Sequence, residues 1–558
     1  MKKQHIGLAA FLGALIFCYT FFLQPNISGT PLTEAPAKKP QTILLIPLDS
    51  RPPCRQFVVD AALIDNIKII LPPTELLDYY YQEGDTKKLS KWLKDNFHNV
   101  DAAVISVDQL LHGGLIASRE FKSNDLAVKN LPTFFEELHK KEPNIPIYAF
   151  SILPRITPPP SIGGYSLWKD FIEFSRLTDQ LSTVYDADKA ARLSQLKAEL
   201  PAKDLAEYIA RYESNHKLNK ELASLVKKGV LKQLVIGQDD GEEFGIPNIK
   251  KRELKKYLAS EKISEKDVFI THGADEVALS LLAKISADKH HYTPKVYVEY
   301  NTDNIRSKLM PFMAGSVEET VKEKLAFINA KEVASPEQAD FTFFVSCVDS
   351  STIDTRKDSA DRIKKLMLSG SSIALTDLSE NFVSEETVFP FLLKNSTPLH
   401  RLIAYAGWNT TSNSIGTAFS QAVLFSAAKK DAKSTEDAKN ICRHNIAFLD
   451  NRFLEDYYFL KEIADTVNIS LQKAGYIYVN DLDLEHNYQW ANAMLQKSLR
   501  ERLENLKYTK AFRAPLEVTA PDGTVKLMVK DLAIDTCYPW PRTFEIYLRT
   551  TPTIIELP

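Results

Sequence analysis

The chain has 558 residues, of which 44% are hydrophobic and 25% are charged, with a formal net charge of −3. This apolar content is typical of a folded globular protein and excludes an intrinsically disordered chain. The near-neutral charge and the lack of a local basic patch argue against a nucleic-acid partner.

The N-terminal segment predicts contact with a membrane. Lys2 and Lys3 precede an uncharged apolar run from Ile6 to Leu23, which is just long enough to cross a bilayer as a helix. We expect residues 1–24 to form a single-pass signal anchor, with the N-terminus in the cytoplasm and the remaining domain outside it. A cleaved signal peptide, and hence a secreted protein, is the alternative. Residues 25–41 contain four prolines and are predicted to be an exposed spacer.

Short β-branched runs then alternate with amphipathic helical stretches, which is the pattern of an α/β protein. Most of the runs are continuously apolar, as expected for parallel strands buried on both faces of a sheet. The predicted strands cover residues 42–49, 67–73, 102–108, 145–153, 234–240, 268–275, 295–300, 341–349, 372–378 and 402–408.

These units suggest one large domain over residues 42–425. Their even spacing favours a (β/α)₈-like barrel, with two doubly wound parallel sheets in tandem as the alternative. A strongly helical insertion is expected from Pro158 to Val230. Residues 426–558 are predicted to form long charged helices followed by a small β element, with a hairpin turn at Pro521-Asp522-Gly523.

No cofactor is indicated by the motifs of the chain. A P-loop and the GxGxxG, GxSxG and HExxH motifs are absent from the sequence, which removes the usual support for a kinase, a dinucleotide oxidoreductase, a serine esterase or a zincin. The five cysteines (Cys18, Cys54, Cys347, Cys442 and Cys537) lack metal-type spacing, and one disulfide could join two of the last four.

Carboxylates follow many of the predicted strands, and these strand ends meet at one face of a parallel α/β domain. Two clusters are the best catalytic candidates, because adjacent carboxylates are costly to bury unless they share a proton or bind a ligand. Helix capping by aspartate is the alternative explanation for such residues. The catalytic candidates are Asp239, Asp240, Asp275 and Glu276.

Other polar strand ends are candidates for binding a carbohydrate or another small polar ligand. An indole beside amides suits a sugar, which offers both apolar C–H groups and hydroxyls, although a capped helix N-terminus would give the same pattern. An ion pair between Asp49 and Arg51 is likewise an alternative to ligand binding. The substrate-binding candidates are Asp49, Arg51, Asp108, His112, Asp377, Trp408, Asn409 and Asn413.

Six sequence blocks resemble the bacterial DUF4127 family, a domain of unknown function. They are ILLIPLDSRPPCRQFV, ISVDQLLHGGLIASR, LVIGQDDGEEFG, HGADEVALSLLAK, AGWNTTSNSIGTAFSQAVL and YPWPRTFEIYL. The resemblance runs from about residue 42 to the C-terminus and implies no activity. His272 departs from the family pattern, which speaks against a catalytic role for this histidine.

The Asp239-Asp240 pair is also similar to the paired aspartates of barrel glycosidases that cleave N-acetylhexosaminides with the help of the substrate's acetamido group. That resemblance implies that Asp239 polarises the acetamido group and that Asp240 protonates the leaving oxygen. The leading hypothesis is therefore an exported glycoside hydrolase that acts on envelope or environmental glycan.

Two other functions remain open from the sequence. The first is a metal-dependent hydrolase with an oxygen-rich site formed by Asp49, Asp108, Asp239, Asp240, His272 and Asp275. The second is an envelope protein that binds glycan without catalysis.

Overall fold

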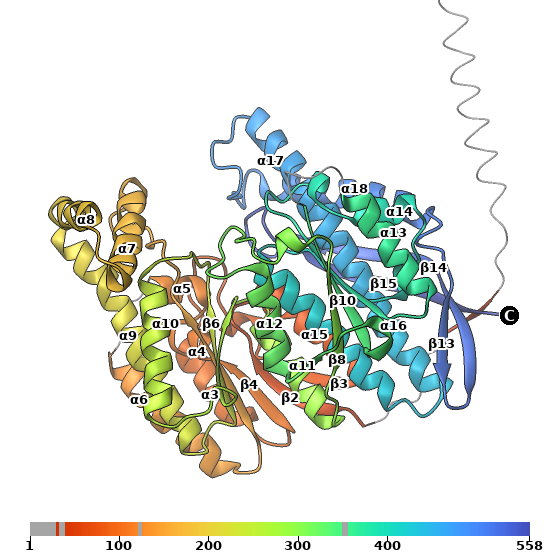
Figure 1. Ribbon diagram of the computed structural model, residues 1–558, viewed down its shortest axis with the longest axis horizontal. Helices are drawn as coiled ribbons and strands as arrows, with labels where there is room; N and C mark the ends of the chain where they lie inside the picture. Colours follow the sequence, from red (N-terminus) through yellow and green to blue (C-terminus); the bar gives the residue numbers. More distant parts are fainter. Residues whose placement is uncertain (1–28, 33–38, 121–124, 349–354) are drawn as a thin grey trace, which may run out of the picture.

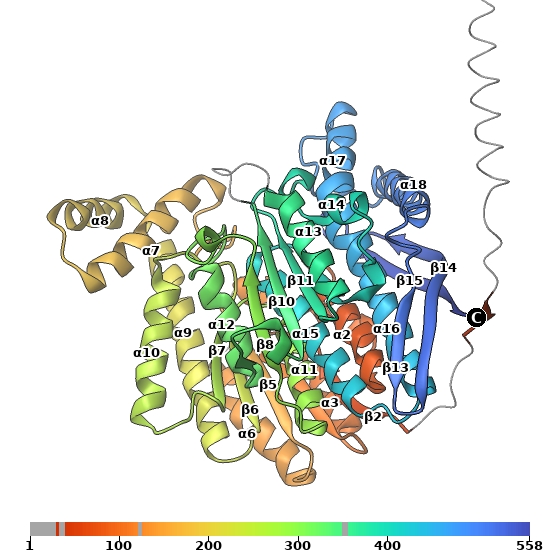
Figure 2. The same cartoon turned by 45° about the vertical axis from the view of Figure 1, so that its right-hand side comes forward.

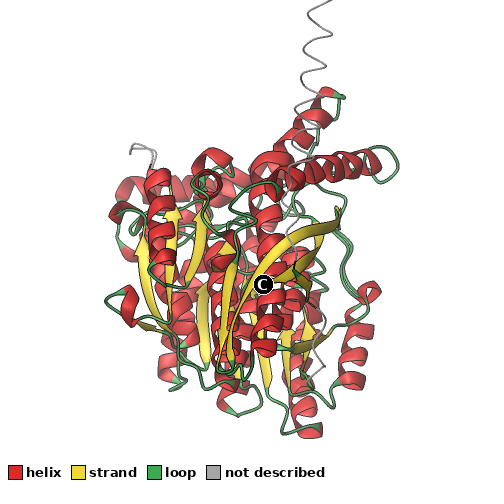
Figure 3. Ribbon diagram, turned by 90° about the vertical axis from the view of Figure 1, so that its right-hand side faces the viewer, coloured by secondary structure: helices red, strands yellow, loops and turns green. Residues whose placement is uncertain are grey.

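The computed structural model describes residues 29–32, 39–120, 125–348 and 355–558. The described chain is an α/β protein with two parallel sheets and one antiparallel sheet (Figure 1). Helices cover the strands on several sides, as the colouring by secondary structure shows (Figure 3).

The first parallel sheet has the order β3-β2-β4-β5-β6-β7. The chain moves from β2 to β3 on one side and then returns to place β4 on the other side of β2. The strand order therefore reverses between β2 and β4, and such a reversal opens a crevice at the carboxyl ends of the two strands. The strands are β2 (Gln41–Ile46), β3 (Ile67–Ile70), β4 (Ala102–Ser106), β5 (Ile147–Leu153), β6 (Gln233–Gln238) and β7 (Val268–His272).

The second parallel sheet has the order β12-β11-β10-β8-β9 and reverses between β8 and β10. Its strands are β8 (Lys295–Tyr300), β9 (Lys331–Glu332), β10 (Phe341–Cys347), β11 (Ile373–Leu378) and β12 (Leu402–Ala406). Both sheets thus begin with the same strand order, and each is open at its edges.

The ten predicted strands are confirmed, but the favoured closed barrel is wrong and the tandem-sheet alternative fits. A barrel would need each new strand to join the same side of the growing sheet. Here β4 and β10 both join the opposite side from the strand that precedes them. Even strand spacing is common to both architectures, so the sequence alone could not separate them.

One layer of helices lies between the two parallel sheets. α11 (Val277–Lys289) packs against α15 (Thr411–Lys430), α2 (Gln56–Ala62) and β5, while α15 also packs against β11 and β12. Their apolar side chains join residues of both sheets in one large core. α11 follows the last strand of the first sheet and leads directly to the second sheet, so the two sheets share this core.

The outer faces of the sheets are covered by further helices. A second core joins the first sheet to α3 (Thr86–Asn96), α6 (Asp125–Lys141), α9 (Ala202–Lys227) and α10 (Ile246–Ser260). The remaining helices of this part are α4 (Val107–His112), α5 (Leu115–Arg119), α12 (Val317–Ile328), α13 (Thr355–Leu368) and α14 (Phe389–Lys394).

The segment between β5 and β6 is helical, as predicted. α7 (Trp168–Thr183) and α8 (Ala187–Glu199) project from the body of the molecule (Figures 1 and 2), whereas α9 also packs on β5 and β6. A small core that includes Phe171 and Tyr208 holds these helices together.

The C-terminal part contains helices and an antiparallel sheet. The elements are α16 (Thr435–Arg452), a π-helix (Phe453–Ile463), α17 (Ala464–Lys473), α18 (Tyr488–Lys507), β13 (Leu516–Ala520), β14 (Gly523–Cys537) and β15 (Tyr547–Leu557). β13 and β14 pair with Ala520 opposite Gly523, which confirms the predicted hairpin.

The expected anchor over residues 1–24 lies outside the described residues. No helix in the described part of the chain is long and apolar enough to cross a membrane. Part of the predicted spacer is not merely exposed, because β1 (Thr30–Pro31) pairs with the end of β15. The four described cysteines, Cys54, Cys347, Cys442 and Cys537, are all free thiols, so no disulfide joins them.

Candidate functional site

A cavity of about 320 Å³ lies at the carboxyl ends of β6 and β7, where the first sheet faces the start of α15. Loops from distant parts of the chain complete its wall. Seven charged side chains line it: Arg51, Arg119, Arg155, Asp239, Asp240, Asp275 and Arg542.

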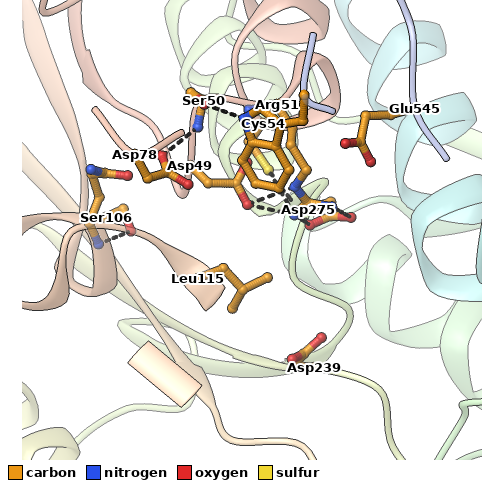
Figure 4. Close-up of polar contacts among 12 residues, drawn as sticks. Asp49, Ser50, Arg51, Cys54, Asp78, Ser106, Leu115, Asp239, Asp275 and Glu545 are labelled. Atoms are coloured by element: carbon orange, nitrogen blue, oxygen red, sulfur yellow. Dashed lines mark hydrogen bonds and ion pairs between the residues drawn. The ribbon is translucent and has the colours of Figure 1, made fainter. Parts of the chain in front are cut away.

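One wall is a buried ion-pair cluster built on Arg51. Its Nη2 lies 2.6 Å from Asp49 Oδ2 and 2.6 Å from Asp275 Oδ1, so it joins the loop after β2 to the loop after β7 (Figure 4). The proposed Asp49–Arg51 ion pair is therefore present, and it extends to Asp275. Burial raises the pKa of Asp275 to about 6, although Arg51 opposes this rise.

The six residues predicted to bind a metal do not form one ligand cluster, although Asp239, Asp240 and Asp275 line the same cavity. Among the described residues, the metal-compatible group is Asp49, Cys54 and Asp275, with one possible ligand atom each within 4.8 Å of one another. The Arg51 guanidinium already bridges the two aspartates, and burial raises the pKa of the Cys54 thiol well above its ordinary value. A cation here would have to displace Arg51 and deprotonate Cys54, so the residues fit a metal poorly.

The second wall is the adjacent pair Asp239 and Asp240, directly after β6. Asp239 is buried and accepts two hydrogen bonds from Arg119, 2.9 Å from Nε and 2.5 Å from Nη2 to Oδ2. The Asp240 side chain is 33% exposed, and its Oδ2 lies 3.5 Å from Arg155 Nη1. The two neighbouring carboxylates thus point to different arginines.

This difference moves the two pKa values in opposite directions. Burial alone would raise the pKa of Asp239, but Arg119 and Arg155 outweigh burial and hold it below its ordinary value. Burial and the charge of Asp239 raise the pKa of Asp240. Pairs of titratable groups with separated pKa values are the usual arrangement of an acid and an ionised partner in catalysis.

The third wall is the start of α15. Asn409 adopts a left-handed conformation, with φ 53°, and lines the cavity together with Thr410, Ser412 and Asn413. Asn413 is 5% exposed, and its Nδ2 lies 3.5 Å from Asp275 Oδ2. Its Oδ1 is buried and has no hydrogen-bond partner among the described residues, so a donor on a ligand would satisfy it.

The remaining predicted site residues lie elsewhere. Trp408 is 1% exposed and packs edge-on against Phe57 and Phe544, so its ring has no free face for a sugar. The Asp377 carboxylate accepts backbone N–H groups from Val388 and Phe389. These residues contribute to packing and capping rather than to the cavity wall.

Three further candidates also serve the fold. Glu276 is buried and pairs with Lys324, 2.7 Å from Oε1 to Nζ. Asp108 accepts the Ile152 N–H at 2.9 Å. His112 ends α4, and burial lowers its pKa to about 4. Glu276 and Asp108 therefore hold neighbouring elements together around the strand ends.

His272 faces a different cavity. Its Nδ1 lies 2.8 Å from Glu323, and its Nε2 lies 3.4 Å from Lys251 Nζ. This cavity is bordered by α10 and α12 rather than by the start of α15. The histidine is thus separate from the Asp239-Asp240 pair, in agreement with the doubt raised by its sequence context.

Sequence reasoning missed the other arginines and the aromatic rings of the cavity. Arg155 follows β5 by two residues, and attention to basic as well as acidic strand ends would have found it. Arg119 ends a short helix and Arg542 comes from the C-terminal part, so no local pattern marks either one. The aromatic lining residues are Phe312, Phe382 and Phe544.

These features define a doubly wound α/β protein with a charged, ligand-sized cavity at the carboxyl ends of its first sheet. The family model described as "Protein of unknown function (DUF4127)" matches residues 43–549, and the chain therefore belongs to the DUF4127 family. Among curated proteins, none matches the sequence.

Proposed function

We propose that this protein is a glycoside hydrolase that cleaves N-acetylhexosaminides in envelope or environmental glycan. The observation that carries the proposal is the Asp239-Asp240 pair: two adjacent carboxylates that face one cavity, one with a lowered and one with a raised pKa. Amides and aromatic rings in the same wall provide the mixed polar and apolar surface that a sugar requires.

In the first step, the acetamido oxygen of the substrate attacks C1 of the sugar. The bond from C1 to the glycosidic oxygen breaks, and the leaving oxygen keeps the electron pair and takes the proton of Asp240. The Asp239 carboxylate, kept ionised by Arg119, accepts the acetamido N–H and balances the positive charge that develops on that group.

In the second step, water attacks C1 and gives a proton to the Asp240 carboxylate. The bond between C1 and the acetamido oxygen breaks, which restores the acetamido group and the acid form of Asp240. The wall formed by Arg51, Asp49 and Asp275 stays fixed by its ion pairs and orients the sugar.

The proposed location of this activity follows from the N-terminal sequence. The apolar N-terminal segment would hold the enzyme in the cell membrane with its cavity outside the cytoplasm, where envelope glycan is available. Cleavage of the segment would instead secrete it.

Binding without catalysis is the second candidate function. It is favoured by the arginine contacts of each aspartate in the wall, because carboxylates held in ion pairs are common in purely structural or binding sites. Tight binding without turnover would support this alternative.

A glycan release assay tests the proposal. The full chain in detergent micelles is incubated with cell-wall and exopolysaccharide fractions, with and without chelator, beside Asp239→Asn, Asp240→Asn and the exposed control Asp303→Asn. We expect reducing ends from the wild type and from the control, and a decrease of about 100-fold or more in both site variants. Undiminished release by Asp240→Asn would remove Asp240 as the acid, and release abolished by chelator would favour the metal-dependent alternative.

A further inference from the structure

The cavity wall contains four arginines, and three of them are fully engaged by carboxylates. Arg51 bridges Asp49 and Asp275, Arg119 makes two contacts with Asp239, and Arg542 makes two with Glu545. These guanidinium groups are parts of the wall, and a ligand would have to break an ion pair to bind them.

Arg155 is different. Its one ion-pair contact in the described chain is the 3.5 Å approach of Nη1 to Asp240, which is longer than an ordinary charged hydrogen bond. Its Nε has no partner among the described residues. Burial and the nearby charge of Arg119 lower the pKa of Arg155, whereas Asp239 raises that of Arg119 in spite of burial. Arg155 is therefore the guanidinium that lacks a full counter-charge.

The position of Arg155 is nevertheless fixed. Its backbone carbonyl accepts hydrogen bonds from Arg211 Nη2 at 2.8 Å and from Tyr212 Oη at 3.0 Å, and both residues lie in α9 of the helical insertion. α9 itself packs on the first sheet. The insertion thus holds the base of this side chain while its guanidinium faces the cavity.

In the proposed reaction, Arg155 also loses its interaction with the negative charge of Asp240. Asp240 must carry a proton when the substrate binds, and a protonated Asp240 gives Arg155 no negative charge. A partly buried guanidinium without a counter-charge is unfavourable. Because carboxylates match the planar fork of arginine with two parallel hydrogen bonds, a carboxylate on the ligand would complete the site.

The wall also contains an acceptor without a donor, the Oδ1 of Asn413. A sugar hydroxyl or acetamido N–H would supply that hydrogen, whereas an anion without a donor, such as sulfate or chloride, would not. We propose, on the basis of the glycosidase function above, that the substrate is an acidic glycan whose sugar carboxylate binds Arg155 while a neighbouring hydroxyl or amide donates to Asn413.

This arrangement links substrate binding to catalysis. Arg119 and Arg155 both favour the ionised form of Asp240, and a carboxylate on Arg155 neutralises one of these two cations and so removes part of that effect. The acidic substrate thereby keeps the general acid protonated.

Two measurements test the proposal on the full chain in detergent micelles. The first is calorimetric binding of glucuronate and of glucose, which needs no turnover. We expect glucuronate to bind at least about tenfold more tightly than glucose. The preference should disappear in Arg155→Gln, be partly kept in Arg155→Lys, and be unchanged in the exposed control Arg500→Gln. Equal binding of the two sugars, or a preference that survives in Arg155→Gln, would overturn the inference.

The second measurement is release from hyaluronan and from hyaluronan whose carboxylates have been reduced to alcohols. We expect Arg155→Gln to raise KM for native hyaluronan by a larger factor than KM for the reduced polymer. Equal release of both polymers by the wild type would overturn the acidic-substrate inference and leave the glycosidase proposal intact. If the protein binds glucuronate in preference to glucose but releases sugar from no glycan, the glycosidase proposal is overturned and the carboxylate-binding site is supported. Thermal unfolding of each variant shows that it is folded.

Discussion

The two parallel sheets share one strand order, and loops after β6, β7 and β12 all line the cavity, yet the carboxylates that line it follow strands of the first sheet. In the first sheet, Asp239 and Asp240 bind side chains and face open space. In the second sheet, Asp377 is completely buried, and its oxygens accept the N–H groups that begin α14. Strand order therefore offers a place for a ligand, while the use of a strand-end carboxylate by the backbone decides whether that sheet contributes a charged group to it.

The largest expected difference between the two sheets is in how much their ion pairs contribute to the free energy of unfolding. Arg51→Leu leaves Asp49 and Asp275 buried without a counter-charge, and we expect a loss of about 3–5 kcal/mol in the free energy of unfolding. Arg362→Leu removes the pair with Glu299 in the second sheet, where the arginine side chain is 33% exposed, and should cost about 1 kcal/mol or less. Chemical denaturation followed by circular dichroism measures both values, and equal losses would contradict the comparison.

Replacing one strand-end aspartate of each sheet should separate a structural role from a catalytic one. Asp377→Ala removes the acceptor of two buried N–H groups and should lower the free energy of unfolding by about 2–3 kcal/mol, without changing glycan release per folded molecule. Asp240→Asn should decrease release by about 100-fold or more and leave stability nearly unchanged. Denaturation and release are measured on the same preparations, and a loss of release by folded Asp377→Ala would show that Asp377 takes part in the reaction.

We nevertheless expect one buried carboxyl group in each sheet to change the stability of the protein with pH in the same direction. Burial raises the pKa of Asp275 and of Asp377 from 3.8 to about 6. Between these pH values the folded protein binds more protons than the unfolded chain. The contribution of each carboxyl group to the free energy of unfolding is therefore highest below pH 4 and is lost as the pH rises through 6. We expect Asp377→Ala to reduce this loss of stability by about 2 kcal/mol, measured by denaturation at pH 4 and pH 7. An unchanged pH dependence would show that Asp377 titrates normally.

The smallest effect should come from Arg155. Because its contact with Asp240 is long, Arg155→Gln should change the free energy of unfolding by no more than about 0.5 kcal/mol. A larger loss in the same denaturation assay would show that Arg155 belongs to the structural wall with Arg51.

Much of the fold could be predicted from local pattern. Apolar runs predicted ten of the eleven strands of the two parallel sheets, and the exposed two-residue β9 was missed. Pro521-Asp522-Gly523 predicted the hairpin, because both signals are carried by adjacent residues. Pairing between strands is a property of distant segments. The order β3-β2-β4, and with it the choice of two sheets over a barrel, was therefore beyond local reasoning.

The site could be predicted in part for the same reason. Asp239, Asp240, Asp275 and Arg51 were found because each follows a strand closely. Trp408 also follows a strand, but its burial against Phe57 depends on a helix from the start of the chain. Arg119 and Arg542 line the cavity only because distant segments fold together, so their neighbours in the sequence do not identify them as site residues.

The pairing of β1 with β15 has a practical consequence for shortened forms of this protein. β1 covers the outer edge of β15 at Ile555 and Glu556. A chain shortened to begin at Lys39 would leave these edge groups unpaired, and unpaired strand edges promote association between molecules. Preparations that keep residues 29–32 should stay monodisperse more readily than preparations that begin after them.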